Sequence, residues 1–496
     1  MTCWISNAPI LCLFLGLFAC TTPTGTEDTV THPPTHGVLL GEVSSTGAKI
    51  WARGDRPGWM HVAIALADDD SRVASGAAAV LAESDFTATV EIDGLEPGTS
   101  YTARVWFAPN RRAALAPGGS VGRAWFNTAP ARGDARAVRL AWGGDLAGQN
   151  VGRDAALGFA ILPRVLERKP DLFIGLGDMI YADGVIAPQG LYGNAQVPGD
   201  FGPATTIDAY RAHWRYNRAD PQLAALLART PYFAVWDDHE VVNDFSPSED
   251  KGSGQPFAGG ERLMPLGLRA FREYNALADG SGGQLYRSVR WGKHLELFFL
   301  DNRSHREPNR ARDDNPQPKT QLGREQLDWL EQGLAASDAT WRIVISSVPI
   351  AVPTGSAQAR DGWANTDSAT GYERELALLF ATLRVLGIDN TIWLTTDVHF
   401  ATGVEYTPFP DAPGFHVREF VSGPLSAGLF PRQDLDPTFR PRRLFFHGPP
   451  EKPASYDEAL RWFNFGLLSV DGAGRLKIEI VDGRGGTVAS HSIDPR

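Results

Sequence analysis

Five apolar runs in this chain end at aspartates, and two histidines stand close behind them. The aspartates are Asp145, Asp178, Asp237 with Asp238, Asp301, and Asp397. His239 directly follows the adjacent pair, and His399 lies two residues after the last aspartate. Because cysteines occur only at positions 3, 12 and 20, a metal bound by the later sequence must take oxygen and imidazole ligands. Such ligands suit hard or borderline ions such as Fe, Mn, Mg, Ca and Zn.

The strands that precede these aspartates are expected to bring them together. In an α/β fold the carboxyl ends of the strands share one rim, so acids placed there meet in one crevice. Without compensation their charges would repel and raise their pKa values, and bound cations remove that conflict. Asp397 and His399 lie at positions i and i+2 of an extended segment, so both can face the same pair of ions. Tyr181, three residues after Asp178, could add a phenolate.

Each of these residues also has a purely structural interpretation. Asp145 follows two glycines and could form a turn or cap a helix. Tyr181 could be a packed aromatic residue with a satisfied hydroxyl, and His239 a buried, hydrogen-bonded histidine. Asn243 could cap a helix. Asp237 and Asp238 compete for one ligand position, and Asp237 could instead orient a neighbouring group.

After residue 131 the sequence predicts an α/β domain, because apolar strands alternate with helical stretches. Strands are predicted at residues 139–145, 171–178, 232–236, 294–300, 341–347 and 391–396, and a closing hairpin at 463–470 and 475–481. Helices are predicted around residues 154–168 and 320–334, and Gly- and Pro-rich loops at 186–206 and 246–261. Whether residues 417–450 form a lid over the crevice is left open by the sequence.

Residues 37–130 have a different pattern, of short alternating strands separated by turns. The turn at residues 94–98, followed by Tyr101, resembles the tyrosine-bearing corner of fibronectin-like sandwiches. We therefore expect a small fibronectin- or Ig-like β-sandwich here. It contains no cluster of acids or histidines, so spacing or docking is its expected role.

The first 20 residues are typical of an export signal. Residues 10–19 form an apolar run too short to cross a bilayer, and residues 17–20, Leu-Phe-Ala-Cys, resemble a bacterial lipobox. By that resemblance the signal peptide is cleaved before Cys20, its sulfur is acylated, and the Pro/Thr-rich residues 21–36 form a tether. The expected product is an exported lipoprotein held at a membrane, on the periplasmic or cell-surface side. Simple cleavage and secretion is the alternative.

Length and charge restrict the remaining possibilities. A chain of 496 residues exceeds one compact core, so two or three folded units are expected. The 58 acidic residues outnumber the 47 basic ones and give a formal charge of −11. Stable nucleic-acid binding is not expected, because nonspecific binding of that kind needs an excess of cations. We expect a monomer.

Five motifs carry a family resemblance. They are Gly177 to Tyr181, Trp236 to Asp244, Leu300 to Arg303, Asp361 to Trp363 with Gly371-Tyr372, and Thr396 to His399. In this order they resemble the PhoD-type alkaline phosphatases, a branch of the calcineurin-like metallophosphoesterases. The resemblance implies an α/β catalytic domain at residues 131–496, a calcineurin-like αββα sandwich. The segment before it resembles the N-terminal domain of the same family.

The resemblance also implies the ligands of two or more metal ions. Asp178 would bridge two metals, and the ferric site would be completed by Asp145, Tyr181 and His399. The second metal, calcium in this family, would take Asp238 or Asn243 together with Asp397. The family usually has a cysteine at position 145, so the aspartate there leaves the pairing of Fe(III) with Ca(II) open.

The implied activity is that of an exported alkaline phosphatase acting on small-molecule phosphomonoesters, phosphodiesters or both, through a metal-activated hydroxide. His239 would face the leaving group as general acid or electrostatic stabiliser, and Arg303 would clamp a phosphoryl oxygen. A phospholipase-type or polymer-directed phosphodiesterase is one alternative. A non-catalytic, tethered binding lipoprotein is the other.

Overall fold

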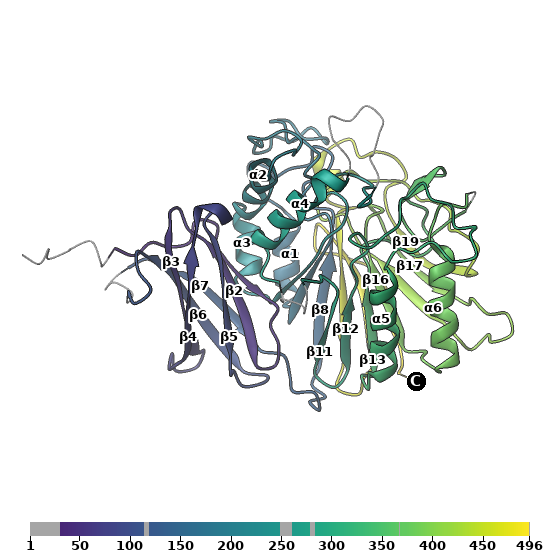
Figure 1. Cartoon of the computed structure of the whole chain (residues 1–496), viewed down its shortest axis with the longest axis horizontal. Coiled ribbons are helices and arrows are strands. Elements are labelled where there is room, and N and C mark those ends of the chain that lie inside the picture. Colours follow the sequence, from purple (N-terminus) through teal and green to yellow (C-terminus); the bar gives the residue numbers. More distant parts are fainter. Residues whose placement is uncertain (1–29, 114–118, 249–259, 278–282, 367, 496) are drawn as a thin grey trace, which may run out of the picture.

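The computed structural model describes residues 30–113, 119–248, 260–277, 283–366 and 368–495. Two large mixed β-sheets pack face to face, helices cover their outer faces, and a smaller sheet lies at one end of the molecule (Figure 1). The helices are α1 (Leu162–Glu167), α2 (Ile207–Arg218), α3 (Pro221–Leu227), α4 (Gly260–Tyr274), α5 (Arg324–Ala336), α6 (Glu373–Val385) and α7 (Tyr456–Ala459).

The first large sheet has nine strands and the second has seven. In spatial order the first contains β22 (Thr487–Ile493), β21 (Leu476–Asp482), β20 (Asn464–Val470), β8 (Val138–Gly143), β9 (Leu172–Leu176), β10 (Tyr232–Val235), β1 (Val38–Gly41), β2 (Gly47–Arg53) and β5 (Thr87–Asp93). The second contains β11 (Arg287–Trp291), β12 (Leu295–Phe299), β13 (Trp341–Ile345), β16 (Thr391–Thr395), β18 (Val417–Val421), β17 (Ala401–Tyr406) and β19 (Pro441–His447).

Each large sheet contains a parallel block that fixes where its loops emerge. Strands β8, β9 and β10 are parallel in the first sheet, and β12, β13, β16 and β18 are parallel in the second. The carboxyl ends within each block therefore share one edge of the sheet, where the crevice of an α/β protein forms.

Apolar side chains on both faces of the strands build three layers of core. Ile174 of β9 and Ile343 of β13 belong to one cluster that fills the space between the large sheets. Phe173 of β9 belongs to a second cluster, with side chains of helices α1 to α4. On the other sheet, Trp393 of β16 packs with residues of α5 and α6, such as Phe380. This order of helix, sheet, sheet and helix confirms the predicted αββα arrangement.

The predicted N-terminal β-sandwich is also present. A four-stranded sheet of β4 (Arg72–Val80), β3 (Gly58–Leu66), β6 (Ser100–Ala108) and β7 (Gly122–Asn127) packs on β1, β2 and β5. The Tyr101 hydroxyl accepts a hydrogen bond from the Glu96 N–H at 2.9 Å, which is the corner expected from the sequence. One sheet of the sandwich is continuous with the nine-stranded sheet, because Gly41 of β1 pairs in parallel with Tyr232 of β10. The division predicted between residues 130 and 131 stays a prediction.

The elements agree with most of the sequence-based predictions, with two differences. The helix predicted at residues 154–168 begins only at Leu162. Asp154 forms a local turn instead, with Gly158 in the left-handed region at φ +65° and the Asp154 carboxylate accepting two backbone N–H groups. The closing hairpin is confirmed as β20 and β21, and the chain adds a further strand, β22.

Three predicted segments need separate comment. Residues 1–29, and most of the loop predicted at 246–261, lie outside the described residues. Residues 417–450 contribute β18 and β19 to the seven-stranded sheet. A two-stranded ribbon of β14 (Gly355–Ser356) and β15 (Ala359–Arg360) lies between β13 and α6 in the sequence. Among the helices of the described residues, none combines the length and the apolar character needed to cross a membrane.

Candidate metal centre

The predicted ligands occupy strained turns directly after the parallel strands. Asp145 follows β8 with φ at 61°, Asp178 follows β9 at 52°, and Asp397 follows β16 at 77°. His399 has φ at 58°. Left-handed conformations cost an L-residue roughly 1–2 kcal/mol, and they persist where the surrounding structure enforces them, often at functional sites. The turns that orient these side chains therefore have a cost in backbone conformational energy.

Asp145, Tyr181 and His399, the residues expected to complete a ferric site, lie close together. The Tyr181 hydroxyl and the His399 Nε2 lie 3.0 Å apart, and His399 Nε2 lies 3.6 Å from Asp145 Oδ1. Thr396 donates a hydrogen bond to Asp145 Oδ2 at 2.8 Å, and the Gly428 carbonyl fixes the His399 ring through Nδ1. Burial lowers the pKa of His399 to about 4, so its ring is neutral and able to bind a metal.

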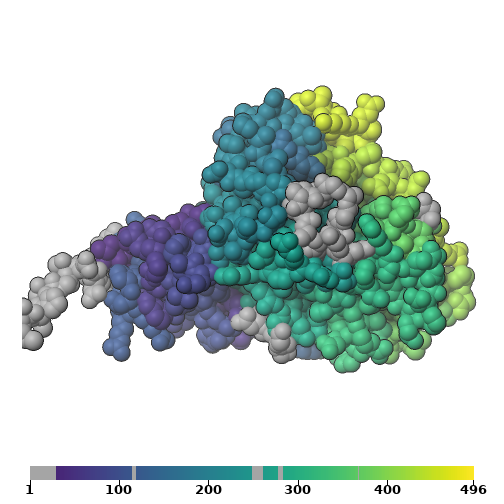
Figure 2. Space-filling model, turned by 45° about the horizontal axis from the view of Figure 1, so that its top comes forward, coloured from purple at the N-terminus to yellow at the C-terminus, as the bar shows by residue number. Residues whose placement is uncertain are grey.

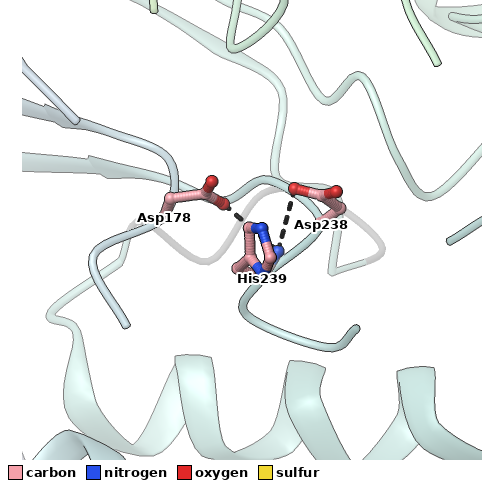
Figure 3. A group of neighbouring side chains, drawn as sticks. All are labelled: Asp178, Asp238 and His239. Atoms are coloured by element: carbon pink, nitrogen blue, oxygen red, sulfur yellow. Dashed lines mark hydrogen bonds between the residues drawn. The ribbon is translucent and has the colours of Figure 1, made fainter. Parts of the chain in front are cut away.

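A second group of acids lies beside the first. Asp178, Asp237, Asp238 and Asp397 each offer a carboxylate oxygen within 4.8 Å of the others. Asp178 and Asp238 also approach His239, whose backbone N–H lies 3.2 and 3.0 Å from their Oδ1 atoms (Figure 3). The two large sheets thus contribute acids to one centre, as the strand-end pattern predicts.

The protein itself compensates the charges of this centre only in part, at Asp237 and Asp238, which approach Arg303. Burial raises the pKa of Asp145 to about 7. Burial, and then the nearby carboxylates, raise the pKa values of Asp178 and Asp397 well above the usual value. Carboxyl groups that are desolvated and crowded in this way take up protons or cations.

Four carboxylate oxygens in the centre accept no hydrogen bond although they are buried. They are Asp145 Oδ1, Asp178 Oδ2, Asp237 Oδ2 and Asp397 Oδ2. Buried polar atoms in folded proteins are almost always satisfied, so four exceptions in one place need an explanation. Metal ions fit, because hard cations take carboxylate oxygens and the neutral His399 supplies a nitrogen.

The His239 ring is held beside the acids by a residue that the sequence analysis missed. His239 Nδ1 lies 2.7 Å from Asp183 Oδ1, and the other oxygen of Asp183 accepts the Asn243 N–H at 2.9 Å. Burial alone would lower the pKa of His239, but Asp183 and Asp238 outweigh it and raise the pKa to about 9. The ring stacks on Tyr181, with centroids 4.0 Å apart. Asp183 lies two residues after Tyr181 in a turn, and this spacing is the sequence feature that could have indicated its role.

Glu240 is a second residue that the sequence analysis missed. Its carboxylate accepts the backbone N–H groups of Asp178 at 3.0 Å, Met179 at 2.7 Å and Asp237 at 2.7 Å. These N–H groups belong to the turns after β9 and β10, so one buried side chain ties two ligand-bearing turns together. The position of Glu240, next to His239 in a run of four polar residues, gave no indication of this role.

Arg303 does not face the crevice as a phosphoryl clamp would. Its side chain is 0% exposed and donates to Asp237 Oδ1, and both terminal nitrogens contact Asp361 at 2.7 Å. Arg306 also donates to Asp361 at 2.8 Å, and Ser347 donates to Asp237 Oδ1 at 2.7 Å. The geometry gives Arg303 a positioning role instead, because its guanidinium holds the Asp237 carboxylate in place.

Asp301 differs from the other strand-end acids. Its Oδ1 accepts hydrogen bonds from Trp236 Nε1 at 2.8 Å and from the N–H groups of Arg303 and Ser304. The pattern predicts that the five strand ends bring several Asp side chains into one crevice; Asp301 is not among those that cluster, and it serves as a hydrogen-bond anchor. The ligand role predicted for Asn243 stays a prediction, and Cys20 lies outside the described residues.

Two family models and a known protein sequence match this chain. A model described as "PhoD-like phosphatase" matches residues 140–475, and one described as "PhoD-like phosphatase, N-terminal domain" matches residues 19–130. Alkaline phosphatase D of Bacillus subtilis (strain 168) is 28% identical over 246 residues. That alignment spans 47% of this chain and 42% of the relative, which is less than half of each.

Two solved structures share the fold. A structure of PhoD has a TM-score of 0.71 at 21% identity and covers 95% of this chain and 94% of its own. The purple acid phosphatase PPD1 of yellow lupin (Lupinus luteus) has a TM-score of 0.60 at 13% identity, covering 93% of this chain and 74% of its own. At these identities the likeness concerns the fold alone.

Proposed function

Because the chain belongs to the PhoD-like phosphatase family, we propose that it is a metal-dependent hydrolase of phosphoric esters, acting on phosphomonoesters, phosphodiesters or both. The observation that carries this proposal is the set of four buried, unsatisfied carboxylate oxygens at one rim of the two sheets. A protein with no cation to bind there would keep a costly cluster of desolvated acids without benefit.

The proposed ligand sets follow the two groups of residues. Asp145, Tyr181 and His399 would hold one ion, and Asp178, which lies in the group with Asp238 and Asp397, would by the family resemblance serve both ions. The second ion takes Asp397 with Asp238, or with Asn243. We propose Fe(III) for the first position and Ca(II) for the second, on the resemblance to the family.

Bound cations would supply positive charge against the phosphoryl oxygens and make water at the site more acidic. The chain's own residues do the rest. His239 carries a proton at neutral and mildly alkaline pH, because the Asp183 carboxylate stabilises its charged ring. We propose that it donates that proton to the leaving oxygen of the ester. Asp183 keeps the ring in that orientation.

We further propose that the protein is exported, acylated at Cys20 and held at a membrane by residues 21–36, and that it is a monomer. The apolar run at residues 10–19 and the lipobox-like residues 17–20 support export and acylation. Small-molecule phosphoesters are the proposed substrates, because the family is one of phosphatases.

The test is metal quantification of the purified protein, combined with phosphate release from an aryl phosphomonoester, a bis-aryl phosphodiester and a phospholipid. We expect bound metal and turnover of at least one ester, lost on chelation and restored by Fe and Ca. The phospholipid arm separates a lipid-directed phosphodiesterase from a general one. A protein without bound metal, and inactive on all three esters after reconstitution, would be a binding module and would refute the proposal.

A further inference from the structure

We propose that the tip of the β-sandwich docks on an anionic membrane surface. The tip is the end of the sandwich where the chain enters the described structure, at Val30. Figure 2 shows the N-terminal part of the chain projecting from one end of the body. In Figure 1, β3 and β4 lie at that end, and α6 lies at the other.

An apolar groove marks the tip. It encloses about 370 Å³ and is lined by Val30, His32, Pro57, Trp59, Phe107 and Pro109 among others. Val30 is 50% exposed, and Trp59 is half-buried. His32 pairs with Phe107 of β6 through two backbone hydrogen bonds of 2.9 and 2.8 Å, so the entering chain forms one wall of the groove. Aromatic and aliphatic side chains of this kind suit the boundary between headgroups and acyl chains.

Arginines surround the groove and continue onto the outer face of the four-stranded sheet. Arg111 lies over the Trp59 ring, 5.5 Å from its centroid, and both Arg111 and Arg112 are exposed. They also line a hollow of about 500 Å³ on that face, together with Arg72 and Arg104. Four arginines around one hollow are a local exception in a chain with a net charge of −11.

Acidic side chains near these arginines offset little of this charge at the tip. Asp55 pairs with Arg56 at 2.9 Å, so these two cancel. Asp70 approaches Arg104 at 3.9 Å from the β3–β4 hairpin, which also carries Asp68 and Asp69 at the opposite end of the strands. In the described part of the chain, Arg111 and Arg112 form no ion pair with an acidic side chain, so they carry positive charge beside the groove.

The adjacency of apolar and basic surface favours a lipid over a soluble anion, which would gain nothing from the apolar groove, and the aliphatic lining by Val30, Pro57 and Pro109 favours a lipid over stacked nucleic-acid bases. The length of the preceding chain agrees. Nine residues lie between Cys20 and Val30, so the two Cα atoms are at most roughly 35 Å apart. If Cys20 is acylated, as proposed above, the tip stays within that distance of the lipid headgroups.

The test uses the full chain with Cys20→Ser, so that an acyl chain cannot cause binding. Binding is measured by co-sedimentation with vesicles of phosphatidylcholine, alone or mixed with phosphatidylglycerol, at low and high salt. We expect binding that needs phosphatidylglycerol and weakens with salt, because exposed charges are screened. Arg111→Glu with Arg112→Glu should weaken binding about tenfold or more. Trp59→Ala should weaken it less, and Trp59→Tyr should restore it.

The matched control is Arg132→Glu with Arg475→Glu, which changes the net charge equally at two exposed arginines that pair with Asp338 and Asp494. We expect this control to bind like the parent. Phosphate release from a soluble ester should be unchanged in both double variants, so failure of the docking proposal is distinct from failure of the proposed function. Absent vesicle binding, equal loss in both variants, or arginine-dependent binding of an oligonucleotide without vesicle binding would overturn it.

Discussion

Two neighbouring groups of buried carboxylates in this protein have opposite surroundings: one group is paired with arginines, and the other is not. Asp361 is 1% exposed and accepts hydrogen bonds from Arg303, Arg306 and Asn309. Asp145 and Asp178 are buried to the same degree. In the described part of the chain, neither they nor Asp397 form an ion pair with Lys or Arg.

This difference shows which acids the fold completes and which it leaves for an external cation. A buried charge without a partner is strongly destabilising, whereas a buried and hydrogen-bonded pair is close to neutral. The arginine-paired group is therefore complete as a structural device. The unpaired group is stable only with protons or metal ions in place.

Asp237 belongs to both groups. Its Oδ1 accepts from Arg303 and Ser347, and its Oδ2 has no hydrogen-bond partner and lies in the group with Asp178, Asp238 and Asp397. Burial raises its pKa, although Arg303 opposes the shift. One carboxylate thus connects the arginine-paired group to the group of proposed ligands.

The largest expected effect comes from the unpaired group. Asp178→Asn removes the charge of the acid that we propose serves both ligand sets, so we expect activity to fall by about 10³-fold or more and bound metal to drop. Metal quantification and ester turnover measure this. The matched control is Asp301→Asn, at a strand end whose acid is already satisfied by Trp236 and two backbone N–H groups.

Asp301→Asn should cost stability but keep the metal content of the parent. If the two variants lost metal equally, the distinction between satisfied and unsatisfied strand-end acids would be wrong. If Asp178→Asn kept full turnover, the acid would not be a ligand.

The next effect concerns the paired group. Arg303→Met leaves Asp237 and Asp361 facing each other without their shared cation, so we expect the free energy of unfolding to fall by roughly 3–5 kcal/mol. Denaturant unfolding measures this. KM for a soluble ester should change little, because the guanidinium is buried.

Arg287→Met is a suitable control, since Arg287 forms a partly buried pair with Glu42, away from the acids of the centre. A tenfold rise of KM in Arg303→Met, with parental stability, would restore the phosphoryl-clamp role implied by the family resemblance and contradict the positioning role.

The sequence supports the fold and the position of the centre because both depend on local pattern. Strands read as apolar runs, and an acid at a strand end lies at the rim whatever the rest of the chain does. The tyrosine corner is equally local, since Glu96 and Tyr101 are five residues apart. These features are set by short-range chemistry, so single-sequence reasoning finds them.

The errors concern contacts between distant residues. Asp301 has the same strand-end pattern as Asp178, and only the Trp236 indole, 65 residues away, shows that it is satisfied. Asp361 lies 58 residues from Arg303, and Asp183 lies 56 residues from His239. No spacing rule links such pairs, because tertiary packing alone decides which side chains meet.

Asp183 is intermediate between the two groups of carboxylates, because its charge is compensated by a histidine. Asp183→Asn removes the charge that holds the His239 ring and sustains its protonation, so we expect turnover to fall about 10- to 100-fold with little change in bound metal. The alkaline limb of the pH–rate profile should move to lower pH, because the pKa of His239 falls.

Steady-state kinetics across pH measure this, and Asp208→Asn, an exposed acid that pairs with Arg211, is the control. Loss of metal in Asp183→Asn would place that residue among the ligands. An unchanged pH profile would show that His239 does not take part in proton transfer.

The smallest effect comes from a buried acid compensated by hydrogen bonds alone. Glu375 accepts the Thr320 hydroxyl and the N–H groups of Gln321 and Leu322, and burial raises its pKa from 4.5 to about 7. The folded state therefore holds a proton that the unfolded state releases, so its contribution to stability falls as pH rises from 4.5 to about 7. Glu375→Gln should remove about 2 kcal/mol of this pH dependence.

Denaturant unfolding of the metal-saturated protein near the two ends of that window measures the change, and Glu451→Gln at an exposed position is the control. Chelation should leave this part of the pH dependence unaltered, because Glu375 is satisfied by groups of the chain itself. Added metal could instead change the pH dependence due to Glu375 as strongly as it changes the pH dependence due to the acids of the centre. In that case hydrogen bonds would not compensate a buried carboxylate here, and the contrast between complete and incomplete groups of acids would be wrong.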